Sequence, residues 1–181
     1  MFHLNTELLI DYWRARRGER RIPARSDIDP AAFAALLPQA FILVRDPDGV
    51  FRFRLAGETI NDLHGRGLRG EPVDLLWRPD HRRHLAGVLD AALRTAEPVV
   101  IDAEALADDG AVRRLEILFA PLGGPVGVPD RFLGLYQSTS AHLRPAKSPL
   151  RDLAIRALDG AEARPAGPKL RLAVVDGRRI A

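Results

Sequence analysis

Residues 40–57 read AFILVRDPDGVFRFRLAG, and this stretch decides the fold. Two runs of strand character flank Pro47-Asp48-Gly49, a triplet that is typical of the turn in a β-hairpin. In the second run three apolar residues alternate with Arg52 and Arg54. A period of two places alternate side chains on opposite faces of a strand, so one face is predicted to be apolar and the other cationic. The predicted apolar residues are Phe51, Phe53 and Leu55.

Three further strands are predicted beyond this hairpin. Residues 99–107 turn at Asp108-Asp109-Gly110 into residues 112–122, and a loop rich in glycine and proline leads to residues 131–140. The crossover between the two groups contains the strongest helix pattern of the chain, at residues 80–97. Tight turns join antiparallel strands, and a helical crossover covers one face of a sheet. The expected fold class is therefore α+β, with a five-stranded antiparallel sheet and helices on one face.

A second amphipathic helix is predicted at residues 4–17, ending at Gly18. Six arginines crowd residues 12–25, which suggests at first an arm that grips nucleic acid. A free arm would not need an apolar stripe, and this segment has one at helical spacing. We therefore expect the helix to cover the open face of the sheet or to mediate a homodimer. The candidate interaction residues are Leu8, Leu9, Tyr12 and Trp13.

Composition limits the classes of function. The chain of 181 residues has a net charge of +3 and no cysteine, which removes disulfides and thiolate chemistry. Residues 26–142 are acidic, with 12 basic and 17 acidic side chains, whereas both ends are basic. No signal peptide and no apolar run long enough to span a membrane is evident, so we expect a cytoplasmic protein without membrane insertion.

Motifs for catalysis or metal binding are weak. Residues 65–70, GRGLRG, fit the G-x-G-x-x-G pattern, but a dinucleotide site needs a strand before it and a helix after it. Here a helix precedes the motif and Glu71-Pro72 follows it. His81 and His84 share one face of the long helix, yet no third ligand has convincing spacing. We therefore predict no catalytic residue, no metal site and no enzymatic activity.

Several stretches, taken in order, carry a family resemblance. They are LLIDYWRARRGERRIPARSDIDP (8–30), LLPQAFILV (36–44), FRFRLAGETIN (51–61), HGRGLRG (64–70) and RFLGLYQ (131–137). Together with the order of elements, they resemble a PAS-like family common in alphaproteobacteria. The resemblance implies a sensory or interaction module. It leaves the cofactor unknown, although some PAS domains hold haem through a histidine on the long helix. His64 stands where the family pattern has an aromatic residue.

A ligand cavity between sheet and helices is the expected site of such a module. His64 ends a short helix at residues 58–65 and has two readings. It either orients a ligand inside an apolar pocket or is a partly exposed residue satisfied by backbone. Trp77 and Tyr136 are read either as pocket wall or as core with a polar tip. The candidate cavity residues are His64, Phe53, Leu63, Trp77 and Tyr136.

The favoured function is therefore a PAS-like signalling, sensor or protein-interaction module that acts through contact. Its expected partners are a second copy, a signalling protein or a small molecule. The alternatives are a nucleic-acid-binding regulator that uses the basic ends, and a small cavity enzyme. The acidic body and the missing recognition motif argue against nucleic acid. The predicted organisation is a helix with a basic linker at 1–25, a PAS-like domain at 26–140 and a basic tail at 141–181. That tail contains a weak helix at 149–158 and an apolar piece at 170–175.

Overall fold

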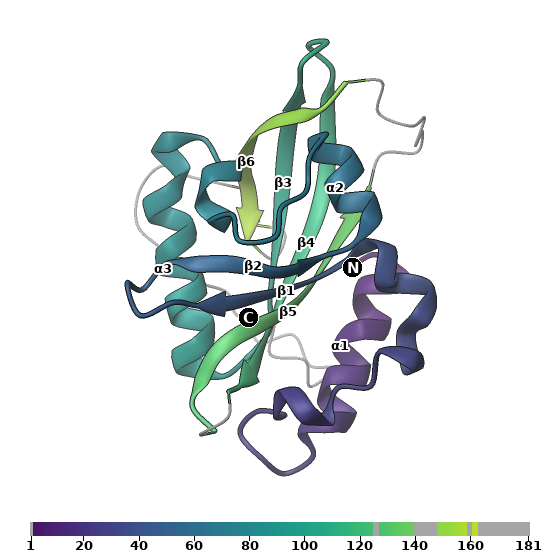
Figure 1. The fold of residues 1–181 in the computed structure, drawn as a ribbon, viewed down its shortest axis with the longest axis vertical. Coiled ribbons are helices and arrows are strands. Elements are labelled where there is room, and N and C mark those ends of the chain that lie inside the picture. Colours follow the sequence, from purple (N-terminus) through teal and green to yellow (C-terminus); the bar gives the residue numbers. More distant parts are fainter. Residues whose placement is uncertain (1, 125–126, 140–147, 159–160, 163–181) are drawn as a thin grey trace.

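A computed structural model describes residues 2–124, 127–139, 148–158 and 161–162. Its centre is one antiparallel sheet with the strand order β2-β1-β5-β4-β3-β6-β7 (Figure 1). Every pairing between neighbouring strands is antiparallel. The strands are β1 (Ala40–Arg45), β2 (Phe51–Ala56), β3 (Val99–Ala107), β4 (Val112–Gly123), β5 (Pro129–Ser138), β6 (Leu150–Leu158) and β7 (Ala161–Glu162).

The α+β class and the five predicted strands are confirmed, but the predicted strand count is wrong. β6 pairs with β3 along its whole length, and the two-residue β7 pairs with β6. The weak helix expected at residues 149–158 is thus a strand. Its apolar residues misled the prediction, because they are spaced by three, two and three positions rather than by two. The predicted apolar piece at 170–175 lies outside the described residues.

Two β-bulges explain that irregular spacing in β6. The register against β3 shifts between Asp102 and Ala103 and again between Leu106 and Ala107. Each shift inserts one extra residue, Arg151 or Arg156, which would turn the following side chains to the wrong face of an unbroken strand. With the bulges, four apolar side chains reach the same core. These are Leu150, Leu153, Ile155 and Leu158.

The opening hairpin forms as predicted, with one exception. The Gly49 amide donates to the Asp46 carbonyl at 2.8 Å and closes the turn. Phe51 and Phe53 are buried, but Leu55 is 50% exposed, so its predicted inward orientation is wrong. The cause is a bulge, since the register between β1 and β2 shifts after Phe53 and pairs Leu55 with Ile42.

The helices lie on two sides of the sheet (Figure 1). On one side, α2 (Glu58–His64), the 3-10 turn η3 (Val73–Leu76) and α3 (Pro79–Thr95) cover a core of interlocking aromatic rings. Phe41 is at its centre, and its ring lies 5.5–5.7 Å from the rings of Phe53, Phe119 and Tyr136. Gly134 makes this possible, because a Cβ there would lie 1.9 Å from Cζ of Phe41.

The other side of the sheet is covered by α1 (Leu4–Arg17) and by the 3-10 helix η2 (Pro30–Gln39). The prediction that α1 docks onto the open face is confirmed in the fold. Trp13 is fully buried there, and its indole nitrogen donates to the Pro121 carbonyl at 2.7 Å. Buried Leu118 and Leu133 supply the aliphatic surface under the helix. A short 3-10 turn, η1 (Arg25–Asp27), links α1 to η2.

The start of α1 is fixed to the sheet by a polar contact. The backbone amide of His3 donates to both carboxylate oxygens of Glu116, at 3.0 and 3.3 Å, and Asn5 donates to Gln137 at 3.0 Å. Glu116 is buried under the helix, with 5% of its surface exposed. A carboxylate is stabilised at a helix N-terminus because the amides there have no intrahelical partner.

No helix within the described residues is long and apolar enough to cross a membrane.

The arginine run of residues 12–25 contacts the protein itself. Arg17 pairs with Glu97 of α3 at 2.9 Å, Arg20 pairs with Asp27 at 2.7 Å, and Arg21 donates to the backbone carbonyl of Arg94. The other three have local contacts. Arg14 pairs with Asp11, Arg16 lies over the Tyr12 ring, and Arg25 donates to the Ile28 carbonyl. The segment is therefore a docked helix with an exit loop fastened to α3, as its apolar stripe predicted.

Candidate functional site

The five predicted cavity residues lie on the helical side of the sheet, but most of them are packed as core. Phe53, Trp77 and Tyr136 are at most 3% exposed and belong to the aromatic core, and Leu63 is half-buried against it. Burial raises the pKa of the Tyr136 hydroxyl well above its usual range. His64 lines a pocket at the surface.

His64 lies at the C-terminal end of α2 with its ring buried against β5 and β6. The ring is 6.0 Å from that of Tyr136, and its Nδ1 is 3.3 Å from the carbonyl oxygen of Leu150. A carbonyl oxygen only accepts, so Nδ1 carries the proton and donates. Nε2 is then a bare acceptor, buried and without a hydrogen-bond partner among the described residues. The prediction that His64 is partly exposed is wrong, because the residue is buried. The prediction of a hydrogen bond to the backbone holds for Nδ1 but not for Nε2.

The electrostatics of His64 follow from this burial. Desolvation lowers its pKa from 6.5 to about 4, against the raising effect of the hydrogen bond to Leu150, and the nearby Arg66 guanidinium lowers it further. The imidazole is therefore neutral at physiological pH. A neutral ring with Nδ1 occupied offers its surroundings one acceptor at Nε2, which suits a ligand that donates a hydrogen bond.

The pocket beside His64 has a volume of about 620 Å³ and opens between α2, η3 and the start of β6. Leu75 and Leu76 of η3 give it an apolar wall. Its charged groups are largely engaged, because Arg66 pairs with Glu71 at 3.1 Å and Arg151 pairs with Asp108. This combination of apolar wall, a few polar groups and a buried acceptor is the usual make-up of a small-molecule site.

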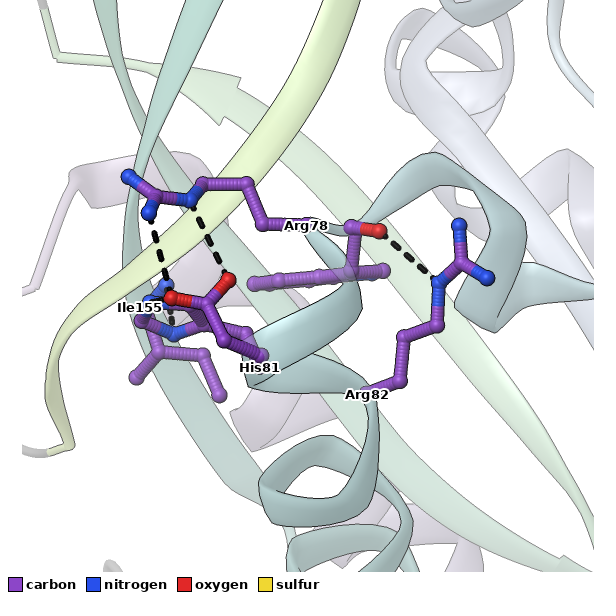
Figure 2. A network of polar contacts seen from close by, with 6 residues as sticks. Arg78, His81, Arg82 and Ile155 are labelled. Atoms are coloured by element: carbon purple, nitrogen blue, oxygen red, sulfur yellow. Dashed lines mark hydrogen bonds and ion pairs between the residues drawn. The ribbon is translucent and has the colours of Figure 1, made fainter.

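β6 forms the outer wall of the pocket and is tied to the helical layer along its length. The Arg78 amide donates to the Leu153 carbonyl at 2.9 Å, and the Ile155 amide donates to Nδ1 of His81 at 3.2 Å. Figure 2 shows the His81 contact at the first turn of α3, where His81 faces the backbone of Ile155. With the contact between His64 and Leu150, these bonds fasten the strand to the helices from its first residue to Ile155.

The first turn of α3 is itself held in place by local contacts (Figure 2). Arg82 donates to the Trp77 carbonyl at 3.0 Å, and Arg78 forms a bidentate pair with Asp80 at 3.1–3.2 Å. His81 is thus a structural acceptor for an edge strand, while His84 points to solvent. His81 and His84, which were considered as a pair of metal ligands, therefore lie in different environments, one bonded to β6 and the other exposed.

α2 also approaches β6 closely at its C-terminal end. Gly65 follows His64 in the left-handed region, with φ of +63°, and its amide donates to the Asp62 carbonyl at 3.1 Å. A Cβ at Gly65 would lie 2.6 Å from Cγ of Pro149, so glycine is required both by backbone conformation and by space. The G-x-G-x-x-G motif thus serves a helix end and the loop after it.

The predicted interaction residues of α1 divide into two groups. Leu9 and Trp13 are fully buried against the sheet, and Tyr12 packs on Phe33 with ring centroids 5.1 Å apart. Leu8 is 53% exposed and lies one turn from Leu4, which is 65% exposed. The apolar stripe of the sequence is therefore used mostly inside the chain, and two leucines remain on its outer surface.

Sequence reasoning missed the wall of the pocket that residues 149–152 contribute, just before and at the start of β6. Residues 149–152 were assigned to the basic tail, because the apolar spacing of β6 does not alternate. The local signal for a strand was weak, because Ile155 is the one β-branched residue in LRDLAIRAL and its apolar residues fall on one face only if bulges are allowed at the arginines. The lining residues that were not among the predicted cavity residues are Gly65, Arg66, Leu75, Leu76, Pro149, Leu150, Arg151 and Asp152.

The order of elements and the helical layer can now be compared with known proteins. A family model described as a PAS domain matches residues 1–137, which is more than half of the chain. The chain belongs to the PAS domain family. The suspected resemblance and the PAS-like fold are thereby confirmed, and the match includes α1. No curated protein matches the chain.

Solved structures with a similar fold include further PAS and light-oxygen-voltage domains. A light-oxygen-voltage domain studied with a flavin analogue is 17% identical, with a TM-score of 0.49, and the match covers 61% of this chain and 84% of that one. A Rhodobacter sphaeroides LOV protein is 16% identical, with a TM-score of 0.48 and coverage of 64% and 71%. The PAS domain of a protein from Colwellia psychrerythraea is 19% identical, with a TM-score of 0.47 and coverage of 63% and 100%.

Proposed function

We propose that this PAS domain is a non-enzymatic sensor module that binds a small molecule beside His64 and signals through the position of β6. The observation that carries the proposal is the His64 ring, which lines the pocket and bonds to the backbone of β6. Its buried Nε2 lacks a partner among the residues described, and an unmet buried acceptor costs about 1–3 kcal/mol. A ligand with a hydroxyl or N–H donor would recover that free energy.

The mechanism is a shift of population between two positions of β6. A ligand that reaches Nε2 needs space beside residues 149–152, which form the outer wall of the pocket. It changes the contact between His64 and Leu150, and the strand follows because the two are bonded. A ligand shifts such an equilibrium only by its difference in affinity for the two states. The donor to Nε2 supplies that difference.

The proposal is tested by a fragment screen, read by two-dimensional amide NMR, with wild type, His64→Gln and the control His84→Gln. His84 is an exposed histidine on α3, so its replacement changes composition without touching the pocket. We expect fragments with a hydrogen-bond donor to shift amides of residues 61–66 and 148–155 in wild type and in the control, and to lose affinity in His64→Gln. Equal binding by all three proteins, or shifts confined to other regions, would refute the role of His64. Native mass spectrometry of the protein as purified tests for a ligand already bound.

We also propose a homodimer formed through the outer surface of α1. Leu4 and Leu8 are exposed one turn apart on a helix whose inner side is already buried, which favours a second copy of α1 as partner. Light scattering of wild type and Leu8→Glu tests this without uncovering the sheet. A dimer that dissociates in Leu8→Glu supports the proposal, and a monomer in wild type contradicts it.

The alternatives receive less support. Each of the six arginines between residues 12 and 25 is engaged within the chain, so the N-terminal segment does not offer a free basic arm. A cavity enzyme would need an acid or base that contacts a substrate. The pocket offers a neutral histidine whose Nδ1 is already bonded to backbone, which is a group suited to orientation.

A further inference from the structure

A second pocket lies away from His64, where the arginine exit loop meets α3. Its volume is about 530 Å³, and it shares no lining residue with the His64 pocket. Three arginines from three separate segments line it: Arg21 after α1, Arg45 at the end of β1 and Arg94 near the end of α3. One carboxylate, that of Asp90, lines it as well, together with Leu93 and Pro129.

The three guanidinium groups are not equally neutralised. Arg45 pairs with Asp90 at 3.1 Å, donates to the Gly49 carbonyl and lies over the Phe51 ring, so it is held in place. Arg21 donates to the backbone carbonyl of Arg94, one of the unpaired carbonyls at the end of α3. Neither Arg21 nor Arg94 has a carboxylate partner within the described part of the chain.

This arrangement holds positive charges close together with too few negative ones. Three guanidinium groups and one carboxylate leave two uncompensated positive charges at the pocket. Like charges gathered on a protein surface raise its potential and attract an anion of matching charge. The planar donor fork of arginine fits phosphate oxygens in pairs, which a lysine ammonium does not.

We propose that this pocket, the arginine pocket, binds a small organic phosphate. A phosphate monoester carries a charge of about −1.5 to −2 at pH 7, which matches the two uncompensated charges better than a carboxylate does. The pocket is larger than a phosphate group needs, and Leu93 and Pro129 provide apolar surface for the organic part. Arg94 supplies a donor fork that has no carboxylate partner among the described residues, Arg21 adds its remaining donors, and Arg45 is pre-oriented by its contacts.

The test is a calorimetric titration of the full chain with phenyl phosphate, inorganic phosphate and benzenesulfonate at constant ionic strength. Phenyl phosphate is expected to bind more tightly than the other two, since it combines the double charge with an apolar group. Arg94→Gln is expected to weaken phenyl phosphate binding about tenfold or more, the usual effect of losing hydrogen bonds to a charged group. The matched control is Arg83→Gln, which removes an exposed arginine from the same helix outside the pocket.

For a third variant, we expect the affinity for phenyl phosphate to increase. Asp90→Asn removes the one lining carboxylate and frees Arg45, so phenyl phosphate is expected to bind several-fold more tightly. Equal losses in Arg94→Gln and Arg83→Gln would mean nonspecific attraction and would overturn the site. Equal affinity for phenyl phosphate and inorganic phosphate would overturn the organic ligand in favour of free phosphate. No heat of binding from any of the three probes would overturn the proposal altogether.

Discussion

The two faces of the sheet are buried in different ways. On the α1 face, α1 packs on aliphatic side chains of the strands, and its Trp13 is fully buried among them. Polar contacts to Glu116 fix the start of the helix. On the helical face, aromatic rings fill the core, and three buried polar atoms there lack partners among the described residues: His64 Nε2, Trp77 Nε1 and Asp74 Oδ1. The α1 face also keeps buried polar atoms without a partner among the described residues, on Thr6, Arg14 and Gln39, but on the helical face such an atom belongs to a residue that lines a pocket, His64. This difference supports the proposal that a small molecule is recognised on the helical face, beside His64.

The largest expected effect concerns the closure of the α1 face. Trp13→Ala removes a fully buried ring and its bond to the Pro121 carbonyl, so the free energy of unfolding should fall by about 3–5 kcal/mol. Arg16→Lys, at an exposed position of the same helix outside the proposed dimer surface, should stay within about 0.5 kcal/mol of wild type. Urea denaturation measures both. A small loss for Trp13→Ala would mean that α1 does not seal this face.

The second prediction concerns the buried histidine of the helical face. His64 keeps a pKa of about 4 in the folded chain, whereas a histidine in an unfolded chain titrates near 6.5. Between these pH values the unfolded state binds more protons, so the free energy of unfolding decreases as the pH falls. The full loss is roughly 3 kcal/mol and is complete below about pH 4.

The pH dependence is isolated by comparing variants. Denaturation at a series of pH values from about 7 to 4 should show the loss in wild type and in His84→Gln, and a smaller slope in His64→Gln. Parallel slopes in all three proteins would contradict the burial of a neutral His64, because other groups would then account for the dependence.

A smaller effect is expected where α3 meets β6. His81→Ala removes the acceptor for the Ile155 amide and should cost about 1 kcal/mol, while the amide exchanges faster with solvent. His84→Ala is the control on the same helix. Exchange at Ile155 that is unchanged in His81→Ala would show that the strand edge is held by its other contacts.

The smallest effect is expected at the surface, between the arginine exit loop and α3. Glu97→Gln breaks the ion pair with Arg17, whose two side chains are each 28% exposed, and should change the free energy of unfolding by less than about 1 kcal/mol. The loss should shrink further in 0.5–1 M salt, roughly the range where surface charges are screened. A loss as large as that of Trp13→Ala would mean that charge, rather than the tryptophan, holds α1 in place.

The sequence predicted those elements whose periodicity is regular. The hairpin turns at Asp48-Gly49 and at Asp109-Gly110 combine turn chemistry with alternating strands, and both form. The apolar stripe of α1 likewise gave the docked helix. Leu55 and the whole of β6 were misassigned for the same reason. A bulge moves every residue after it to the other face of the strand, and a search for strict alternation in the sequence does not detect it.

The candidate site was predictable in part. His64 was chosen because it ends a short helix beside the expected cavity and stands where the family pattern has an aromatic residue, and it does line a pocket. Phe53, Trp77 and Tyr136 were chosen as wall residues, and the packing of rings around Phe41 places them in the core instead of at an open surface. The wall formed by residues 149–152 depends on a pairing with β3 that is distant in sequence, which no local pattern encodes.

The central claim is that His64 couples the pocket to β6, and amide hydrogen exchange tests it most directly. Exchange in a peptide covering residues 148–158 is compared in wild type, His64→Gln and His84→Gln at pH 7. The account predicts faster exchange of this peptide in His64→Gln alone, with β1, β4 and β5 as protected as in wild type. Unchanged exchange in β6, or an equal increase throughout the sheet, would contradict the coupling.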